Sequence, residues 1–330
     1  MSYAYHRLAR SAPKYAWWKA LVTGVIAFAF YIVLALVVAV GFFVVALLDP
    51  TGVGESFDAL LYDGVIDNSS PFILAFSLSS VALMLPAIIL ARLIMGPRPL
   101  GLLSSVTGRL RWRWMLRLAL PTLLAFALSF AVYLLVLPLA AGEPLLAPEI
   151  SDVTWMLLAV TLLLVPLQAT AEEYVFRGYL MQAIGGWLRH PAWAILLPVP
   201  LFMAGHLYDV WGLLDVGVFA LWAGWITWRT GGLEAAIAAH VINNASIFAL
   251  SAFGLVDPNV TEGSPLGVVV TALTLALVSL LVLRLARTGG PDGGPVLRER
   301  VVVLAAPESA PSPSRGVVGS QPQNPASFVD

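Results

Sequence analysis

The chain has 330 residues, of which 59% are hydrophobic and only 11% are charged. A soluble domain usually carries about 25% charged residues, so this composition excludes an ordinary soluble protein. The net charge of −1 offers no sign of a nucleic-acid partner, and the absence of cysteine excludes disulfides, thiolate metal sites and a cysteine nucleophile.

The predicted elements begin with a polar, basic and aromatic segment at residues 1–19, followed by the uncharged apolar run 20–48. That run is too long for the core of a signal peptide and predicts a membrane-spanning helix, anchored at the interface by Trp17, Trp18 and Lys19. Seven further spans are predicted, at 71–91, 117–139, 153–180, 192–211, 213–229, 233–252 and 264–284. The sequence therefore predicts an all-α fold, a polytopic transmembrane helical bundle of about eight spans.

The charge of the loops gives an independent prediction of the span count. The segment before the first predicted span is basic, the loop after it is acidic without Lys or Arg, and this alternation continues to the last span. The positive-inside rule keeps basic loops in the cytoplasm, so both termini are predicted to be cytoplasmic. Arginine greatly outnumbers lysine and the tail is short, which favours a bacterial cell and therefore its inner membrane.

Polar residues interrupt the apolar spans, and a charge at mid-membrane costs roughly 2.5–3.5 kcal/mol on insertion scales. The first group is Glu172, Glu173 and Arg177, in the fourth predicted span. Glu173 and Arg177 are four residues apart, so they share a helix face and are expected to form a structural ion pair. Glu172 points about 100° away and has no local cation. It needs a partner on another helix, which makes it the candidate for chemistry.

Two further groups lie on later predicted spans. His206 follows Phe202 by four residues, and Asn244 follows His240 by four residues, so each pair is expected to share a helix face. A single buried histidine is usually a satisfied core residue. Two histidines, an unpaired glutamate and an asparagine within one apolar bundle favour a functional site instead.

Helix length predicts the depth of these residues. Glu172 lies about 16 residues before the turn that joins the fourth and fifth predicted spans, and His206 lies about 16 residues after it. Both would be roughly 24 Å from that turn, provided that the fourth helix runs on to about Trp187. His240 is only about nine residues past the turn that precedes it, so spacing alone predicts it nearer to the cytoplasmic face.

These residue types suit hydrolysis. A glutamate beside a histidine can hold and deprotonate a water, and a second histidine with an asparagine amide can donate hydrogen bonds to an oxyanion. Such a site cleaves a peptide bond without a covalent intermediate. Glu172, His206 and His240 could instead ligate zinc, which activates a bound water. The HExxH motif of soluble metalloproteases is absent from the chain.

Three motifs in order carry a resemblance to a known family. They are Glu172-Glu173-x-x-x-Arg177, Phe202-x-x-x-His206 and His240-x-x-x-Asn244. Together they resemble the signature of the CPBP family, which contains the type II CAAX prenyl proteases and the bacteriocin-processing or Abi proteins. The resemblance covers roughly residues 150 to 250.

The resemblance implies a role for each motif residue. The roles are water activation by Glu172 and His206, oxyanion stabilisation by His240 and Asn244, and support from the motif residues Glu173, Arg177 and Phe202. The family has been described both as metalloproteases and as metal-independent glutamate proteases. Asn244 is a better oxyanion donor than zinc ligand, so metal-free water activation is expected, no cofactor is favoured, and zinc stays open as the alternative.

The predicted function is an intramembrane endopeptidase, surrounded by the lipid bilayer, that cleaves a peptide or membrane-associated protein. A prenylated substrate is open, although a bacterial relative is better matched to an unmodified peptide or membrane protein. The same buried polar residues could serve a membrane transporter, but the sequence shows no inverted repeat. A third hypothesis for the function is a non-catalytic membrane scaffold or immunity protein.

These predictions divide the chain into five segments. They are a cytoplasmic N-terminal segment (1–19), N-terminal spans (20–149), a catalytic transmembrane core (150–252), a last span with its loop (253–287) and a disordered cytoplasmic tail (288–330). The tail is assigned as disordered because it is rich in Pro, Ser, Gly and Gln.

Overall fold

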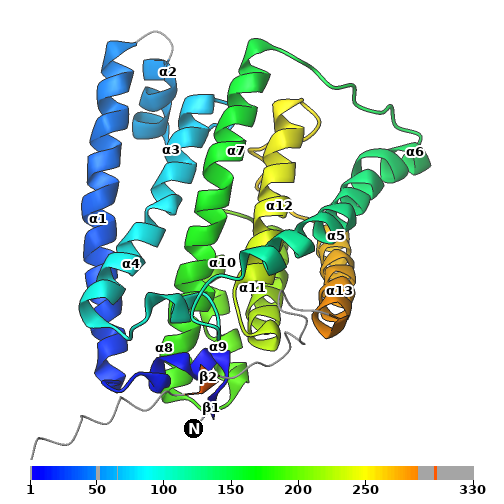
Figure 1. Ribbon diagram of the computed structural model, residues 1–330. Coiled ribbons are helices and arrows are strands. Elements are labelled where there is room, and N and C mark those ends of the chain that lie inside the picture. Colours follow the sequence, from blue (N-terminus) through cyan, green and yellow to red (C-terminus); the bar gives the residue numbers. More distant parts are fainter. Residues whose placement is uncertain (1, 50–52, 65, 289–300, 303–330) are drawn as a thin grey trace, which may run out of the picture.

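A computed structural model describes residues 2–49, 53–64, 66–288 and 301–302 of the chain. Within these residues the secondary structure is helical, apart from β1 (Ser2–Tyr3) and β2 (Val301–Val302), which form one antiparallel pair (Figure 1). The predicted helical class is therefore confirmed for this part of the chain. Most of the predicted disordered tail, 288–330, lies outside the described residues.

Seven stretches of helix in the described residues are long and apolar enough to cross a membrane. They are α1 (Trp17–Leu48), α3 (Pro71–Ala82) with α4 (Met84–Met95), α5 (Trp112–Ala131) with the π-helix Val132–Val136 and α6 (Leu137–Ala141), α7 (Asp152–Glu173) with the π-helix η5 (Tyr174–Leu180) and α8 (Met181–Trp187), α11 (Val210–Thr230), α12 (Glu234–Ala252) and α13 (Pro265–Thr288). The shorter helices are the 3₁₀-helix η1 (Tyr5–Ser11), α2 (Val53–Asp58), the π-helix Ala59–Asp63, the 3₁₀-helix Leu100–Leu103, α9 (Pro191–Leu196) and α10 (Pro198–Met203). The chain is an integral membrane protein.

The fifth predicted span, 192–211, does not form a helix of spanning length. α9 and α10 together cover only Pro191–Met203, which is about 20 Å long against a hydrocarbon core of about 30 Å. Pro198 and Pro200 have no N–H for helical hydrogen bonds, and residues 204–209 are not helical. The described residues therefore contain seven candidate spans where the sequence predicted eight.

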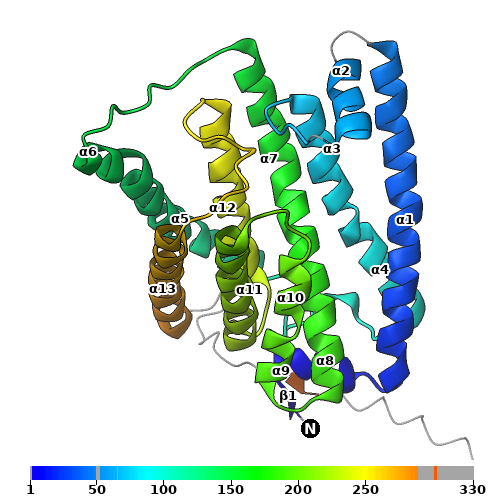
Figure 2. The same ribbon diagram turned by 180° about the vertical axis from the view of Figure 1, so that it is seen from behind.

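The short α9–α10 segment keeps successive helices of the bundle running in alternating directions. In Figures 1 and 2, α8 ends at the face where the N-terminal segment lies, and α10 rises from there only part of the way. α11 then runs back toward the same face but ends inside the bundle, where Leu233, just beyond its end, packs in a cluster with Tyr5. The fourth and fifth predicted spans were expected to form a hairpin of two full-length helices. In the structure the second arm of that hairpin is the short α9–α10 segment, and α11 runs back from its end.

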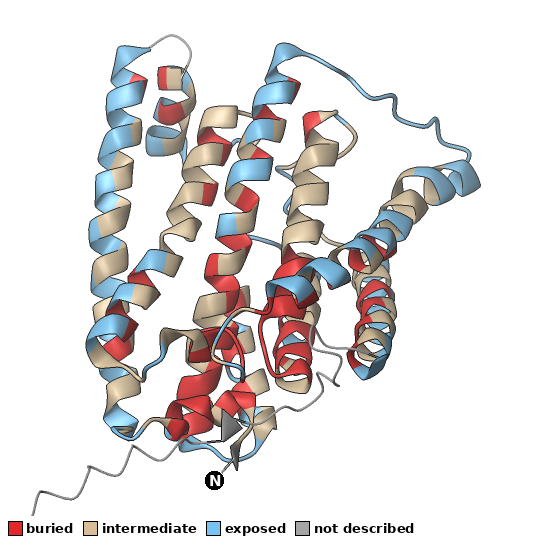
Figure 3. Ribbon diagram, viewed as in Figure 1, coloured by how far each residue is buried: buried red, intermediate tan, exposed pale blue. Residues whose placement is uncertain are grey.

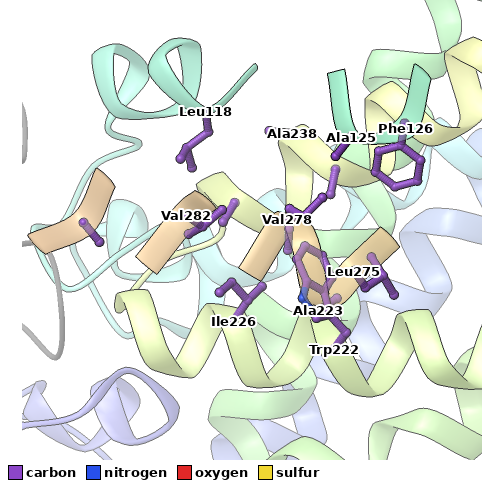
Figure 4. Packing of buried hydrophobic residues seen from close by; sticks show 14 of the residues in the cluster. Leu118, Ala125, Phe126, Trp222, Ala223, Ile226, Ala238, Leu275, Val278 and Val282 are labelled. Atoms are coloured by element: carbon purple, nitrogen blue, oxygen red, sulfur yellow. The ribbon is translucent and has the colours of Figure 1, made fainter. Parts of the chain in front are cut away.

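The end of α13 lies toward that same face. Nε1 of Trp222 on α11 donates a hydrogen bond to Oγ of Ser279 on α13, at 2.8 Å. Figure 4 shows Trp222 beside Leu275, and Ile226 beside Val282, in one buried hydrophobic cluster. α13 therefore runs parallel to α11, and both described ends of the bundle are on one side.

Burial is concentrated in the half of the bundle nearest the N-terminal segment. Buried residues gather along α8, the adjoining part of α7, α11 and the first half of α12 (Figure 3). In contrast, α1 buries only Thr23 and Ala46 along its length, as expected of a helix whose surface faces lipid rather than water. The polar residues discussed below lie in the buried half.

A buried ion pair fixes the turn between α11 and α12. Nε and Nη2 of Arg111 donate to the two carboxylate oxygens of Glu234 at 2.9 and 2.7 Å, and the backbone N–H of Arg111 donates to the same carboxylate. Gly231 ends α11 with a φ of 71°, which favours glycine. The turn is therefore enclosed within the bundle and does not extend to its outer surface.

Candidate active site

The fourth predicted span continues well beyond its acidic pair. α7, η5 and α8 form one helical stretch from Asp152 to Trp187, as the predicted depth of Glu172 required. A capping box at Ser151 begins it, with the Ser151 side chain and the Thr154 side chain each bonding the other residue's backbone. The π-helix Tyr174–Leu180 starts directly after Glu173, and such widened turns are frequent at functional sites.

Glu173 forms the ion pair that the sequence predicted. The carboxylate is fully buried, and its Oε1 accepts a hydrogen bond from Nη1 of Arg177 at 2.8 Å. Nη2 of Arg177 donates to the backbone oxygen of Ala220 on α11 at 3.2 Å. The guanidinium also lies over the ring of Phe202, 4.4 Å from its centroid, a contact that stabilises a desolvated cation by up to about 2 kcal/mol.

Glu172 finds its partner on another helix, as its lack of a local cation predicted. Oε2 of Glu172 lies 3.2 Å from Nε2 of His240 on α12 and accepts from Nε2 of Gln168 at 2.9 Å. Nδ1 of the same histidine lies 2.8 Å from Oε1 of Glu173. His240 therefore joins the two adjacent glutamates, one on each ring nitrogen.

This arrangement balances charge inside the membrane. When both carboxylates are ionised, both ring nitrogens of His240 must carry protons, because a carboxylate only accepts hydrogen bonds. The charges of Glu172, Glu173, Arg177 and His240 then sum to zero. A neutral, mutually bonded group of this kind avoids the cost of an isolated buried charge.

The depth that spacing alone predicted for His240 is wrong, because α12 starts inside the bundle. Leu233, immediately before α12, packs in one cluster with Met181 of α8, and its side chain lies beside Gly178. His240 is seven residues further along α12, or about 10 Å. Glu173 precedes Gly178 by five residues on the neighbouring helix, so the two side chains reach the same level.

Asn244 extends the polar group by one turn of α12. Its Nδ2 donates to Oε1 of Gln168 at 3.2 Å, and its Oδ1 accepts from Nδ2 of Asn243 at 3.1 Å. Gln168 thus connects Asn244 to Glu172. Since an amide nitrogen carries two hydrogens, the second N–H of Asn244 remains available to another acceptor.

His206 lies in the loop that follows α10, not on a helix as predicted. Its Nδ1 bonds the backbone oxygen of Phe202 at 2.8 Å, and a carbonyl can only accept, so Nδ1 carries a proton. In the neutral ring Nε2 then has a free lone pair. The Phe202 ring lies 5.0 Å from the ring of His206 and 6.2 Å from that of His240, so one phenylalanine contacts both imidazoles.

A cavity of about 470 Å³ lies beside these residues. His206, His240, Asn243 and Asn244 contribute to its wall. The rest of the wall comes from α5, the π-helix after it, α10 and the loop after it, α11, the end of α12, the loop before α13 and α13 itself. Glu172 is not in the wall but contacts His240, which is. The cavity therefore brings His206 and His240 to one space, with Glu172 directly behind.

Sequence reasoning missed several residues of this region. Gln168 could have been found, because it lies four residues before Glu172 on the same helix face. Asp215 forms part of the cavity wall and has a buried Oδ1 without a hydrogen-bond partner among the described residues. The backbone N–H groups of Gly212 and Gly263 donate to Asp209, which lowers the pKa of that carboxyl and ties the loop before α13 to α11.

The three residues considered as zinc ligands do not converge on one point. Zinc requires three or four ligand atoms around the metal, and no group of three or more His, Asp or Glu side chains in the described residues has that arrangement. Both ring nitrogens of His240 face carboxylates, and Nδ1 of His206 faces a backbone oxygen. The side chains as they lie do not fit a zinc ion shared by Glu172, His206 and His240.

Comparison with known proteins supports the resemblance. Residues 154–246 match the family model described as "Type II CAAX prenyl endopeptidase Rce1-like", and this range contains all three motifs. The uncharacterized protein YyaK of Bacillus subtilis (strain 168) is 29% identical over 168 residues, which are 48% of this chain and 55% of that protein. The chain thus spans about half the length of this curated relative. No solved structure matches the chain.

Proposed function

We propose that this chain is an intramembrane endopeptidase with its catalytic core at residues 150–252, because residues 154–246 match the Rce1-like type II CAAX prenyl endopeptidase model. The observation that carries the proposal is the buried Glu172–His240–Glu173 group, with His240 in the wall of a cavity. Charged residues at this depth are costly and are retained where they serve a function.

In the proposed reaction, Glu172 is the general base. The attacking water is proposed to bridge its carboxylate and Nε2 of His206, whose lone pair would accept one hydrogen bond. As the water oxygen bonds to the peptide carbonyl carbon, Glu172 takes the proton and the carbonyl oxygen becomes an oxyanion. The carbon–nitrogen bond then breaks, and the leaving amine receives the proton from Glu172.

Asn244 is the proposed oxyanion donor. It lies in the cavity wall, and one N–H of its amide remains free when the other bonds Gln168. One such donor typically contributes about 10²–10³ in rate. The resemblance also assigned oxyanion stabilisation to His240, but both of its ring nitrogens face glutamates. Its proposed role is therefore to orient Glu172 directly through Nε2, while Glu173 holds the histidine ring through Nδ1.

The proposed substrate is an extended segment of a peptide or membrane protein. A cavity of about 470 Å³ has room for a few side chains and is within the usual range for small ligands, so a folded domain is too large. Phe126, Phe202 and Phe219 contribute apolar wall, which suits a hydrophobic segment. A prenyl chain is a further apolar group that such a wall would accept.

The proposal is tested by incubating purified protein with a quenched peptide library in detergent. Cleavage should occur and should survive prolonged dialysis against a strong chelator, because the proposed water activation uses only side chains. A matched sample with added zinc should show no gain. Stoichiometric zinc that is lost and regained together with activity would instead establish a metalloprotease, and no cleavage by the intact protein would favour a non-catalytic role or transport.

The orientation of the bundle is part of the proposal. The face that carries the N-terminal segment is the cytoplasmic one, in an inner membrane of bacterial type, because basic loops are retained there. Reporter fusions after Asp63 and Gly142 should read as outside, and a fusion after Arg109 should read as inside. Opposite readings at any two of these three sites would show that the assigned orientation is wrong.

A further inference from the structure

A second cavity lies far from the proposed catalytic group, at the face of the bundle that carries the N-terminal segment. Its volume is about 450 Å³. It is enclosed by the residues between η1 and α1, the first turns of α1, the end of α4 with the following Gly-Pro-Arg segment, and two residues of the η5–α8 helix, Tyr179 and Ala183. Segments from three distant parts of the sequence therefore meet around one space, which we term the N-terminal cavity.

The wall of the N-terminal cavity is positively charged. Lys14, Lys19, Arg92 and Arg98 contribute to it, and no Asp or Glu does. The ammonium of Lys19 donates to the backbone oxygen of Lys14 at 3.0 Å, and Nη2 of Arg98 donates to that of Leu93 at 2.7 Å. These acceptors are neutral, so within the described residues the four positive charges lack an acidic partner.

Arg92 is the strongest sign that an anion belongs here. Its side chain is only 4% exposed, yet Nε and Nη2 have no hydrogen-bond partner among the described residues. Burying an unpaired cation costs several kcal/mol. Nε and Nη2 are the adjacent donors that form a planar fork, and such a fork matches two oxygens of a phosphate or carboxylate. An anion with two or more oxygens would therefore satisfy both donors.

The location of the cavity indicates the source of that anion. Trp17 and Trp18, 61% and 44% exposed at the start of α1, mark the depth of the membrane interface. Ile94 and Met95 add apolar wall beside the cations. Phosphate groups of lipids are concentrated at this depth, and anionic lipids bind juxtamembrane basic groups.

We propose that the N-terminal cavity binds a phosphate group, carried by an anionic lipid headgroup, through Arg92 with Lys14, Lys19 and Arg98. The lipid joins the N-terminal segment, α1 and α4 to the helix that also carries Glu172. Free phosphate shares the chemistry but lacks acyl chains for the apolar wall. A ligand that binds the folded protein raises its melting temperature by mass action.

The test uses the full-length protein in a neutral detergent. Its melting temperature is measured against increasing phosphatidylglycerol, phosphatidylcholine or inorganic phosphate. Phosphatidylglycerol should raise the melting temperature in a saturable way, and phosphatidylcholine should do so far less. The double variant Lys14→Gln, Arg98→Gln removes two exposed charges and should weaken phosphatidylglycerol binding roughly 25-fold, about fivefold for each cation.

Arg113→Gln is the matched control, because Arg113 is an exposed arginine of α5 outside the cavity wall. It should leave the titration unchanged. Arg92→Gln should abolish the effect of lipid, and the double variant keeps the test open if Arg92→Gln fails to fold. Inorganic phosphate that stabilises as strongly as phosphatidylglycerol, with the same loss in the double variant, supports the phosphate site and identifies free phosphate as its source. Equal weakening by Arg113→Gln, or no stabilisation by either anion, overturns the proposal.

Discussion

Replacement of Glu172 by glutamine should lower kcat by roughly 10²–10⁴ while leaving the fold intact. Glutamine has the same shape and can still accept from Gln168, but it cannot take a proton from water. The variant also leaves the buried Glu173–Arg177 ion pair complete, so no arginine loses its partner. The measurement is single-turnover cleavage of the peptide identified from the library, with thermal melting in detergent as the measure of folding.

The control for this variant is Gln168→Leu, which removes a neighbour of Glu172 without touching the base. It should reduce the rate by a smaller factor, because the His240 contact still orients the carboxylate and Asn244 keeps its N–H groups although it loses its bond to Gln168. Retention of full activity by Glu172→Gln would remove Glu172 from the proposed mechanism and make His206 the candidate base.

Replacement of Glu173 by glutamine should mainly destabilise the fold. Glu173 is fully buried and bonds both Arg177 and His240. Arg177 cannot lose its proton, so the variant leaves an uncompensated buried cation. Removing one partner of a buried ion pair costs about 3–5 kcal/mol. For a chain of this size we expect the melting temperature to fall by on the order of 10 °C.

A double variant shows whether Glu173→Gln lowers stability by leaving Arg177 unpaired or by disturbing the packing around residue 173. Glu173→Gln with Arg177→Met removes both charges of the pair and should recover part of the lost stability, since apolar replacement of a complete buried pair is often neutral or stabilising. The two glutamates are adjacent in the sequence, so the contrast between them tests their roles directly. If Glu172→Gln proved to be the less stable of the two single variants, the assigned roles would be reversed.

The two variants differ because of the kind of cation that each glutamate faces. Both glutamates contact His240, but only Glu173 also pairs with an arginine, whose charge is permanent. The Glu172–His240 contact joins α7 to α12, so this difference is not visible in the sequence EE. Helix geometry predicted the Glu173–Arg177 pair, but the identity of the partner of Glu172 required the position of α12.

The sequence by itself determined the class of the protein and the members of its candidate site. Apolar runs predicted all seven of the described helical stretches that are long enough to span a membrane, because the mean hydropathy of about 20 residues indicates whether a helix is stable in lipid. The three motifs predicted which polar residues lie inside the bundle, because charge there is too costly to be accidental. Local spacing also predicted the Glu173–Arg177 ion pair, since four residues make just over one helical turn.

Only the tertiary structure decided how these residues meet. The run 192–211 has the hydropathy of a span, yet its prolines and the loop after Met203 end the helix early and place His206 outside any helix. The level of His240 depends on the Arg111–Glu234 pair and on Leu233, which enclose the start of α12 inside the bundle. Such contacts join residues more than 100 positions apart, and no local pattern encodes a distance of that kind. Spacing along one helix predicts the direction of a side chain and its distance along the helix axis. The relative depth at which two helices begin depends instead on the residues that pack against their first turns.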